Sequence, residues 1–273
     1  MISVLKRVLL TCFIIFIIFP NLCLATERIR VATTTSTDNS GLLEVIIPPF
    51  EKMFNVKVDV IAVGTGKAIK LGESGDVDVI LVHAPKAEES FVSEGYGINR
   101  RKVMHNDFIL LGPASDPAGI RGITSAAQAL KQIYKTNSTF VSRGDDSGTH
   151  KKEQEIWDEA NISPKGTWYL EAGQGMGTVL QMAHEKMAYT LSDRGTYLAY
   201  RSKIDSVIVS EGDPVLYNPY GVIAVNPAKH PNTNYIRVMA FIGWLTSPEC
   251  QKMIAEFKKG GEVLFHPDAI QIK

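Results

Sequence analysis

Cysteine is scarce in this sequence. Only three occur in 273 residues, and Cys12 and Cys23 lie in an N-terminal segment that we expect to be removed. Cys250 would then stand alone, which excludes a disulfide framework and a metal site built from several cysteines. The fold must therefore be held by its core, and a mature chain of about 248 residues is long enough to build one.

An excess of charge of one sign is also absent. The chain has 29 basic and 29 acidic residues, and the N-terminal segment contributes only Lys6 and Arg7 to this total. The remaining chain carries a net charge of about −2. This balance argues against nucleic acid and anionic lipid as partners.

An apolar run over residues 8–19 is too short to span a membrane, which takes about 20 residues. It follows Lys6 and Arg7 and precedes Cys23 and Ala25 at the spacing of a cleavage site. We therefore predict a signal peptide over residues 1–25, cleaved near Ala25. For a bacterial chain without disulfides, export implies the periplasm.

Strand-like and helix-like segments alternate along the rest of the chain. Residues 28–34, 56–63 and 77–83 are rich in β-branched residues, whereas residues 65–74 and the segment from Pro85 have a helical pattern. This order predicts an α/β fold in which mostly parallel sheets are flanked by helices.

Two apolar strands, near residues 107–112 and 217–225, each end in proline and glycine and form a matched pair. Another α/β set lies between them. A chain that leaves one lobe, builds a second and returns gives two lobes joined by two crossover strands acting as a hinge. We expect one lobe over residues 26–112 with 220–273, and the other over residues 113–219.

Polar or glycine-rich turns recur after the strands, and each precedes a helix. The start of a helix presents unpaired N–H groups and the positive end of its dipole, so it suits an anion. In open α/β sheets such turns share one edge. The five turns are residues 33–37, 64–68, 142–150, 173–178 and 190–196.

Arg143 is the strongest candidate for binding an anion, because its planar guanidinium offers several donors to an oxyanion. Asp145 or Asp146 can orient it, and pairing with them on the surface is the simpler alternative. Ser147 and Thr149 would add hydroxyl donors, and Gly148 would let the backbone approach closely.

Other interpretations of this turn are weaker. Arg143–Asp145 form an RGD tripeptide, but adhesion needs an exposed flexible loop, and here a strand and a helix bracket it. A nucleophilic Ser147 needs a general base, and the sequence has no G-x-S-x-G elbow around it. We therefore favour an anion pocket.

Five segments together resemble the tungstate-binding proteins that deliver an oxoanion to an ABC importer. They are "ATTTST", "VGTGKAI", "DVILVHAPKAEE", "SRGDDSGTHKKE" and "YTLSDRGTY", and the likeness covers nearly all of the mature chain. The resemblance implies the two-lobed type II periplasmic-binding fold, no enzymatic activity and no cofactor. It implies tungstate or molybdate as ligand, and a membrane permease as partner of a monomer.

Phosphate-binding proteins of the same fold share the Arg-x-Asp-x-Ser-Gly-Thr motif and are the main alternative. By the same resemblance they carry an aspartate at the place of His83, where it accepts the proton that phosphate retains near neutral pH. Tungstate and molybdate have no such proton and would be repelled by a buried carboxylate. A neutral His83 could donate to them. A secreted phosphoester hydrolase is a third possibility, but no base or metal site accompanies Ser147.

The resemblance assigns the ligand to residues in all five turns, with the inward-facing member of Thr33–Thr35 left open. The residues are Thr34, Thr35, Ser36, Thr65, Gly66, Arg143, Ser147, Gly148, Thr149, Gly177, Thr178 and Thr190, with His83 as a further candidate.

Overall fold

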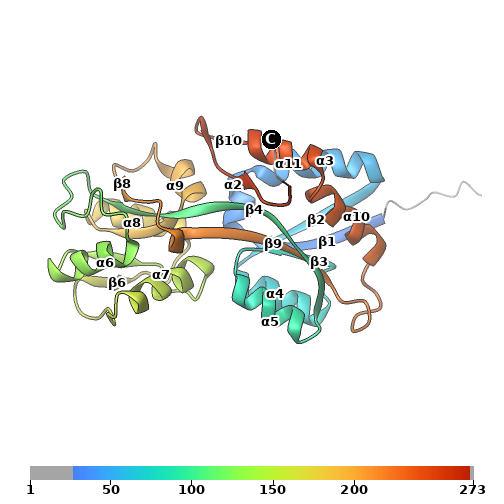
Figure 1. Ribbon diagram of the computed structural model, residues 1–273, viewed down its shortest axis with the longest axis horizontal. Coiled ribbons are helices and arrows are strands. Elements are labelled where there is room, and N and C mark those ends of the chain that lie inside the picture. Colours follow the sequence, from blue (N-terminus) through green and yellow to red (C-terminus); the bar gives the residue numbers. More distant parts are fainter. Residues whose placement is uncertain (1–26, 271–273) are drawn as a thin grey trace, which may run out of the picture.

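The computed structural model describes residues 27–270 as two lobes joined by two long strands (Figure 1). The predicted signal peptide, residues 1–25, lies outside this described part. None of the helices between residues 27 and 270 is both long and apolar enough to cross a membrane.

The first lobe begins with alternating strands and helices, as predicted. Strand β1 pairs in parallel with β2 on one side and with β3 on the other, so the three strands end at the same edge. Helices α2 and α4 start at that edge. The elements are β1 (Glu27–Thr34), α2 (Thr35–Ser40), α3 (Leu42–Phe54), β2 (Val56–Val63), α4 (Thr65–Ser74), β3 (Val79–Val82) and α5 (Pro85–Ser93).

Two strands, β4 (Gly97–Gly112) and β9 (Tyr217–Val225), cross between the lobes. They are antiparallel to each other, and β9 is also antiparallel to β3. Strand β4 contributes Met104 to the core of the first lobe and Phe108 to that of the second. The α/β fold class is therefore confirmed, with parallel pairing among β1, β2 and β3 and antiparallel pairing where the crossing strands join them.

The second lobe lies between the crossing strands. Here β5 and β6 are parallel, whereas β7 and β8 pair antiparallel with β4. Its core contains the fully buried rings of Phe140 and Trp157, whose centroids are 5.5 Å apart. The elements are α6 (Ala126–Lys135), β5 (Phe140–Ser142), α7 (Gly148–Glu159), β6 (Tyr169–Glu171), α8 (Met176–Glu185), β7 (Thr190–Asp193), α9 (Arg194–Tyr200), β8 (Val207–Ser210) and the 3-10 helix η1 (Pro214–Leu216).

After β9 the chain returns to the first lobe, and a short hairpin there reaches back to the second (Figure 1). The Lys259 ammonium donates to the carbonyl of Ser40 at the end of α2 (2.9 Å). The Arg201 guanidinium, at the end of α9, donates to the carbonyl of Gly260 (3.0 Å) and pairs with Glu262. The hairpin is thus a third connection between the lobes. The elements are α10 (Tyr235–Leu245), α11 (Pro248–Glu256), β10 (Lys258–Lys259), β11 (Glu262–Val263) and β12 (His266–Pro267).

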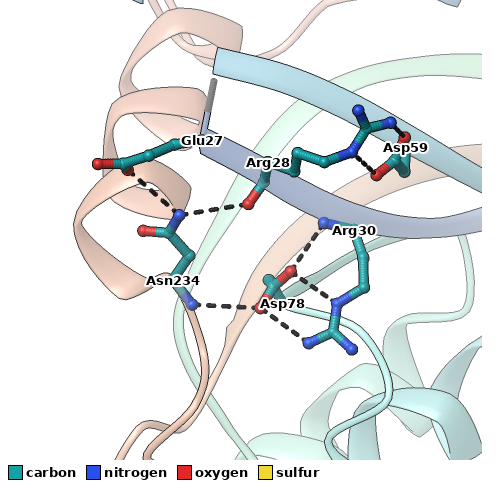
Figure 2. Close-up of polar contacts among 6 residues, drawn as sticks. All are labelled: Glu27, Arg28, Arg30, Asp59, Asp78 and Asn234. Atoms are coloured by element: carbon teal, nitrogen blue, oxygen red, sulfur yellow. Dashed lines mark hydrogen bonds and ion pairs between the residues drawn. The ribbon is translucent and has the colours of Figure 1, made fainter. Parts of the chain in front are cut away.

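A buried carboxylate holds the first lobe together just before β3 (Figure 2). Asp78 is 3% exposed and accepts hydrogen bonds from the backbone N–H of Arg30 (2.7 Å) and from its guanidinium (3.1 Å). It also accepts one from the N–H of Asn234 (3.2 Å), just before α10. Asp78 thus joins strand β1 to the start of helix α10. Its hydrogen bonds should be stronger than neutral ones, because the acceptor is a charged group.

Candidate functional site

A polar cavity of about 490 Å³ lies between α2 of the first lobe and the starts of α8 and α9 in the second. Three of the five predicted turns contribute to its wall, and Arg143 comes from a fourth. The lining residues are Thr35, Ser36, Asn39, Ser40, Arg143, Gly175, Met176, Gly177, Thr178, Gly195, Thr196, Ala199 and Tyr200.

Arg143 follows β5 directly, and its side chain is only 12% exposed. The Nε–H donates to Asp145 Oδ2 (2.8 Å), and the other oxygen of Asp145 accepts from the N–H of Ser147 (3.1 Å). Positive φ at Gly144 (61°) and Asp146 (58°) turns the chain tightly here. The guanidinium has no other hydrogen-bond partner within residues 27–270, so Asp145 orients one edge and leaves the terminal donors for the cavity.

The start of α7 brings the second and third turns together. Ser147 caps this helix by accepting a hydrogen bond from the N–H of His150 (3.3 Å), which leaves its own O–H free to donate. Gly148 packs against the first lobe. A β-carbon there would lie 3.2 Å from His83 Cε1 and 3.4 Å from Thr65 Oγ1, so a larger residue would crowd this contact between the lobes.

The three threonines that precede Ser36 in the first turn have different partners. The Thr33 hydroxyl donates to the carbonyl of Leu81 and holds β1 to β3 (2.8 Å). Thr34 caps α2, accepting from the N–H of Thr37 (3.3 Å), and its hydroxyl also bonds the hydroxyl of Thr37 (2.6 Å). Of the three, Thr35 lines the cavity, next to Ser36.

The Thr190 hydroxyl, like that of Thr33, bonds a neighbouring strand. It donates to the carbonyl of Val141 (2.7 Å) and holds β7 to β5, so that proton is occupied inside the second lobe. Eight of the thirteen predicted residues, Thr190 among them, are absent from the wall of the cavity. They are Thr34, Thr65, Gly66, His83, Ser147, Gly148, Thr149 and Thr190.

His83 is 7% exposed and ends a chain of buried polar groups. Its Nδ1 bonds Asn218 Oδ1 (2.8 Å), because the amide nitrogen of Asn218 donates to Asn106 Oδ1 (2.6 Å). The proton of the neutral ring is therefore on Nδ1. Burial lowers the pKa of His83, which the hydrogen bond with Asn218 and the charge of Asp193 offset only in part.

The expectation that a neutral His83 donates to the ligand is therefore not supported, since its single N–H already bonds Asn218. The ring stacks on Tyr220, with centroids 4.8 Å apart. It lines a second cavity of about 510 Å³, which also has Lys151 and Lys152 in its wall. We interpret His83 as a wall residue of this second cavity whose one N–H is used within the protein.

Sequence reasoning missed Asn39, Thr196 and Tyr200 on the cavity wall. The last two are four residues apart on α9 and so lie on one face of the helix. Thr196 belongs to a predicted turn, and one helical period from it leads to Tyr200. The sequence therefore contained a signal for Tyr200. For Asn39 it did not, because that residue reaches the cavity wall only through the short helix α2.

The arrangement around Ser147 does not suit nucleophilic catalysis. His150, the base nearest in sequence, accepts the backbone N–H of Asp146 at Nδ1 (3.0 Å), and its Nε2 lies 3.2 Å from the amide nitrogen of Gln154, which is itself a donor. The one lone pair that a neutral ring could use as a base is thus already engaged in the loop before α7. What the cavity does offer is a set of donors that converge from two lobes, which is the chemistry of oxoanion binding.

Comparisons with known proteins agree with this geometry. A family model described as "PBP superfamily domain" matches residues 25–249. A putative ABC transporter anion-binding protein of Haloferax volcanii is 53% identical over 90% of this chain and 73% of its own length. The tungstate-binding protein TupA of Peptoclostridium acidaminophilum is 48% identical over 90% of this chain and 87% of its own length.

A solved structure is also similar. The crystal structure of the tungstate ABC transporter from Geobacter sulfurreducens is 56% identical, with a TM-score of 0.79, and the match covers 85% of this chain and 99% of that one. Sequence, family model and fold thus lead to one assignment. The chain belongs to the PBP superfamily and, within it, to the family of the TupA tungstate-binding proteins.

Proposed function

We propose that this protein captures tungstate between its two lobes and delivers it to the membrane permease of an ABC importer. The observation that carries the proposal is Arg143. Its guanidinium is nearly buried, is oriented by Asp145, and keeps unpaired donors at a cavity lined by hydroxyls of both lobes. Relatives named for tungstate binding support the choice of ligand.

The donor set we propose is narrower than the resemblance implied. Arg143, Gly177 and Thr178 would bind from the second lobe, and Thr35 and Ser36 from the first, because all five line one cavity. Ser147 and Thr149 at the start of α7, and Thr65 and Gly66 at the start of α4, would join them when the lobes close. Thr34, Thr190 and His83 would shape the site rather than donate. The protons of Thr190 and His83 have other partners, and the Thr34 hydroxyl is engaged with the N–H and hydroxyl of Thr37.

Closure follows from the position of these donors in two lobes, which we place at residues 26–112 with 220–273 and at residues 113–219. Only a closed form gains contacts from both sides of the ligand, so the ligand shifts the population toward it. We further propose that the protein is a monomer without catalytic activity. It would act in the periplasm after removal of residues 1–25, with molybdate as a second ligand.

Phosphate is the alternative ligand. A neutral His83 with its proton on Nδ1 presents a lone pair on Nε2 and could accept the proton of hydrogen phosphate. The residue type alone therefore does not exclude phosphate, and the preference for tungstate rests on the relatives. A phosphoester hydrolase is disfavoured, because the lone pair on Nδ1 of His150 already accepts the backbone N–H of Asp146.

Isothermal titration of ligand-stripped protein, residues 26–273, tests the proposal with tungstate, molybdate, sulfate and phosphate in a phosphate-free buffer. Tight tungstate binding with weak or no phosphate binding is the expected result. Tight phosphate binding would assign the protein to the alternative. No heat from any of the four anions would contradict an oxoanion site altogether.

A further inference from the structure

Tyr200 ends α9 on the wall of the same cavity as Arg143, although no motif drew attention to it. Within residues 27–270 its hydroxyl has no hydrogen-bond partner. Two other tyrosines of this lobe differ: Tyr169 donates to Glu153 (2.7 Å) and Tyr189 donates to Asp116 (2.7 Å). Tyr200 is thus a half-buried phenol that keeps a free donor at the cavity.

Gly177 shows how closely this phenol approaches the start of α8. A β-carbon built on Gly177 would lie 2.3 Å from the Tyr200 hydroxyl oxygen and 2.4 Å from its Cζ atom. Any residue larger than glycine would therefore displace the ring. Gly177 is the second residue of α8, whose N-cap Gly175 supplies no side-chain hydrogen bond to the first turn. The N–H groups of Thr178 and Val179 bond the Gly175 carbonyl, whereas those of Met176 and Gly177 have no acceptor within residues 27–270. The hydroxyl thus lies beside the start of α8, whose free N–H groups favour an anion.

We infer that the Tyr200 hydroxyl donates a hydrogen bond to the bound oxoanion, and that residue 177 is glycine to let it reach that place. The inference rests on the proposed function and adds a contact to it. The phenol O–H donates to one oxygen of the anion while Arg143 binds from the same lobe. A fully deprotonated tetrahedral anion can accept such a bond at every oxygen.

Tyr200→Phe removes the hydroxyl and keeps the ring. We expect the Kd for tungstate to rise about tenfold or more, because the lost bond is to a charged acceptor. The melting temperature of the ligand-free protein should not change, since no residue from 27 to 270 forms a hydrogen bond with the hydroxyl. Tyr134→Phe is the matched control: it makes the same change on an exposed ring packed against Trp168, and the Kd should stay within about twofold of wild type.

A second pair of variants tests the role of the glycine. Gly177→Ala should weaken binding in the wild-type background, because the methyl group displaces the ring. In a Tyr200→Ala background the same substitution should cost little more, which a double-mutant cycle measures. Equal losses in the two backgrounds would show that Gly177 serves something other than Tyr200, and would overturn that half of the inference.

The outcomes separate the inference from the proposed function. If wild type binds tungstate, Arg143→Ala loses affinity and Tyr200→Phe binds like wild type, Tyr200 is not a ligand donor. If Tyr200→Phe loses affinity and also lowers the ligand-free melting temperature, the hydroxyl has a structural role and the inference is wrong. If wild type binds none of the four anions, the proposed function itself fails.

Discussion

Glu153 is a buried acid beneath the loop that carries Arg143. It lies on α7, is 1% exposed, and accepts three hydrogen bonds. They come from the hydroxyl of Ser142 (2.9 Å), the hydroxyl of Tyr169 (2.7 Å) and the indole N–H of Trp157 (3.2 Å). Because Ser142 directly precedes Arg143, this carboxylate connects the position of the anion loop to the core of the second lobe.

Two substitutions of Glu153 should differ in cost. Glu153→Ala leaves three donors without an acceptor, and at about 1 kcal/mol for each the loss is about 3 kcal/mol or more. This is a large part of a typical stability of about 5–15 kcal/mol. Glu153→Gln keeps an amide oxygen that can accept two of the three bonds, so we expect a loss of about 1 kcal/mol.

The difference in the free energy of unfolding between Glu153→Gln and wild type should also depend on pH. Burial raises the pKa of Glu153, and hydrogen bonds from Tyr169 and Ser142 offset this only in part. Because the pKa is higher in the folded state than the value of 4.5 in the unfolded chain, the protonated Glu153 stabilises the fold. This stabilisation is fully present below pH 4.5 and is lost as the pH rises through the pKa of the folded state. Glutamine has no such proton, so raising the pH should move the difference in favour of the variant.

Urea unfolding of wild type and Glu153→Gln at pH 4.5 and pH 7.5 measures the difference in their free energies of unfolding. The other acidic groups are the same in both proteins, so their pH dependence cancels in this difference. Glu155→Gln is the matched control on the same helix. Its side chain is 44% exposed and pairs with Lys152, so it should change stability by less than about 1 kcal/mol at either pH. A difference between Glu153→Gln and wild type that is constant, or that moves against the variant with rising pH, would refute the reasoning.

Three further predictions concern other parts of the molecule. Arg143→Ala should raise the Kd for tungstate tenfold or more in titration calorimetry, by loss of about 1.5–3 kcal/mol per charged hydrogen bond; an unchanged Kd would remove the arginine from the site. Arg201→Ala cuts the link between α9 and Glu262, and should cost under about 1 kcal/mol in urea unfolding because both side chains are more than a third exposed. A loss of several kcal/mol would instead make the hairpin a main stabilising contact. Gly97→Ala should destabilise by about 1–3 kcal/mol, because the new methyl would lie 2.4 Å from the ring of Phe91; an unchanged thermal midpoint would contradict that crowding.

The sequence predicted most elements of the fold, since periodicity is a local property of the chain. The strand over residues 56–63 and the helix over residues 65–74 form where their patterns indicated. The first half of β4 was missed. It contains Asn99, Arg100 and Arg101, and its pairing with β9 shifts register there, so no clean alternation of apolar residues exists to be recognised.

The candidate site was predictable to the level of turns but not of individual atoms. Ser36, Arg143 and Thr178 come from three predicted turns and line one cavity. The rule that parallel strands end at one edge of a sheet accounts for Arg143 and Thr178, which follow the paired strands β5 and β6, whereas Ser36 follows β1 in the sheet of the other lobe. The rule does not say which hydroxyl of a turn remains free. Thr33 and Thr190 use theirs to bond neighbouring strands at 2.8 and 2.7 Å, and those partners lie 48 and 49 residues away in the sequence.

His83 shows the same limit for a titratable group. An imidazole can donate or accept, and the sequence alone allows either role. Asn218, which lies 135 residues further along the chain and is itself held by Asn106, accepts the hydrogen bond from the N–H at Nδ1. His83 therefore brings no donor to the ligand, and compared with an aspartate its effect is to omit a negative charge. If the protein prefers tungstate, the attraction must come from Arg143 and the hydroxyls around it, with His83 contributing only the absence of repulsion.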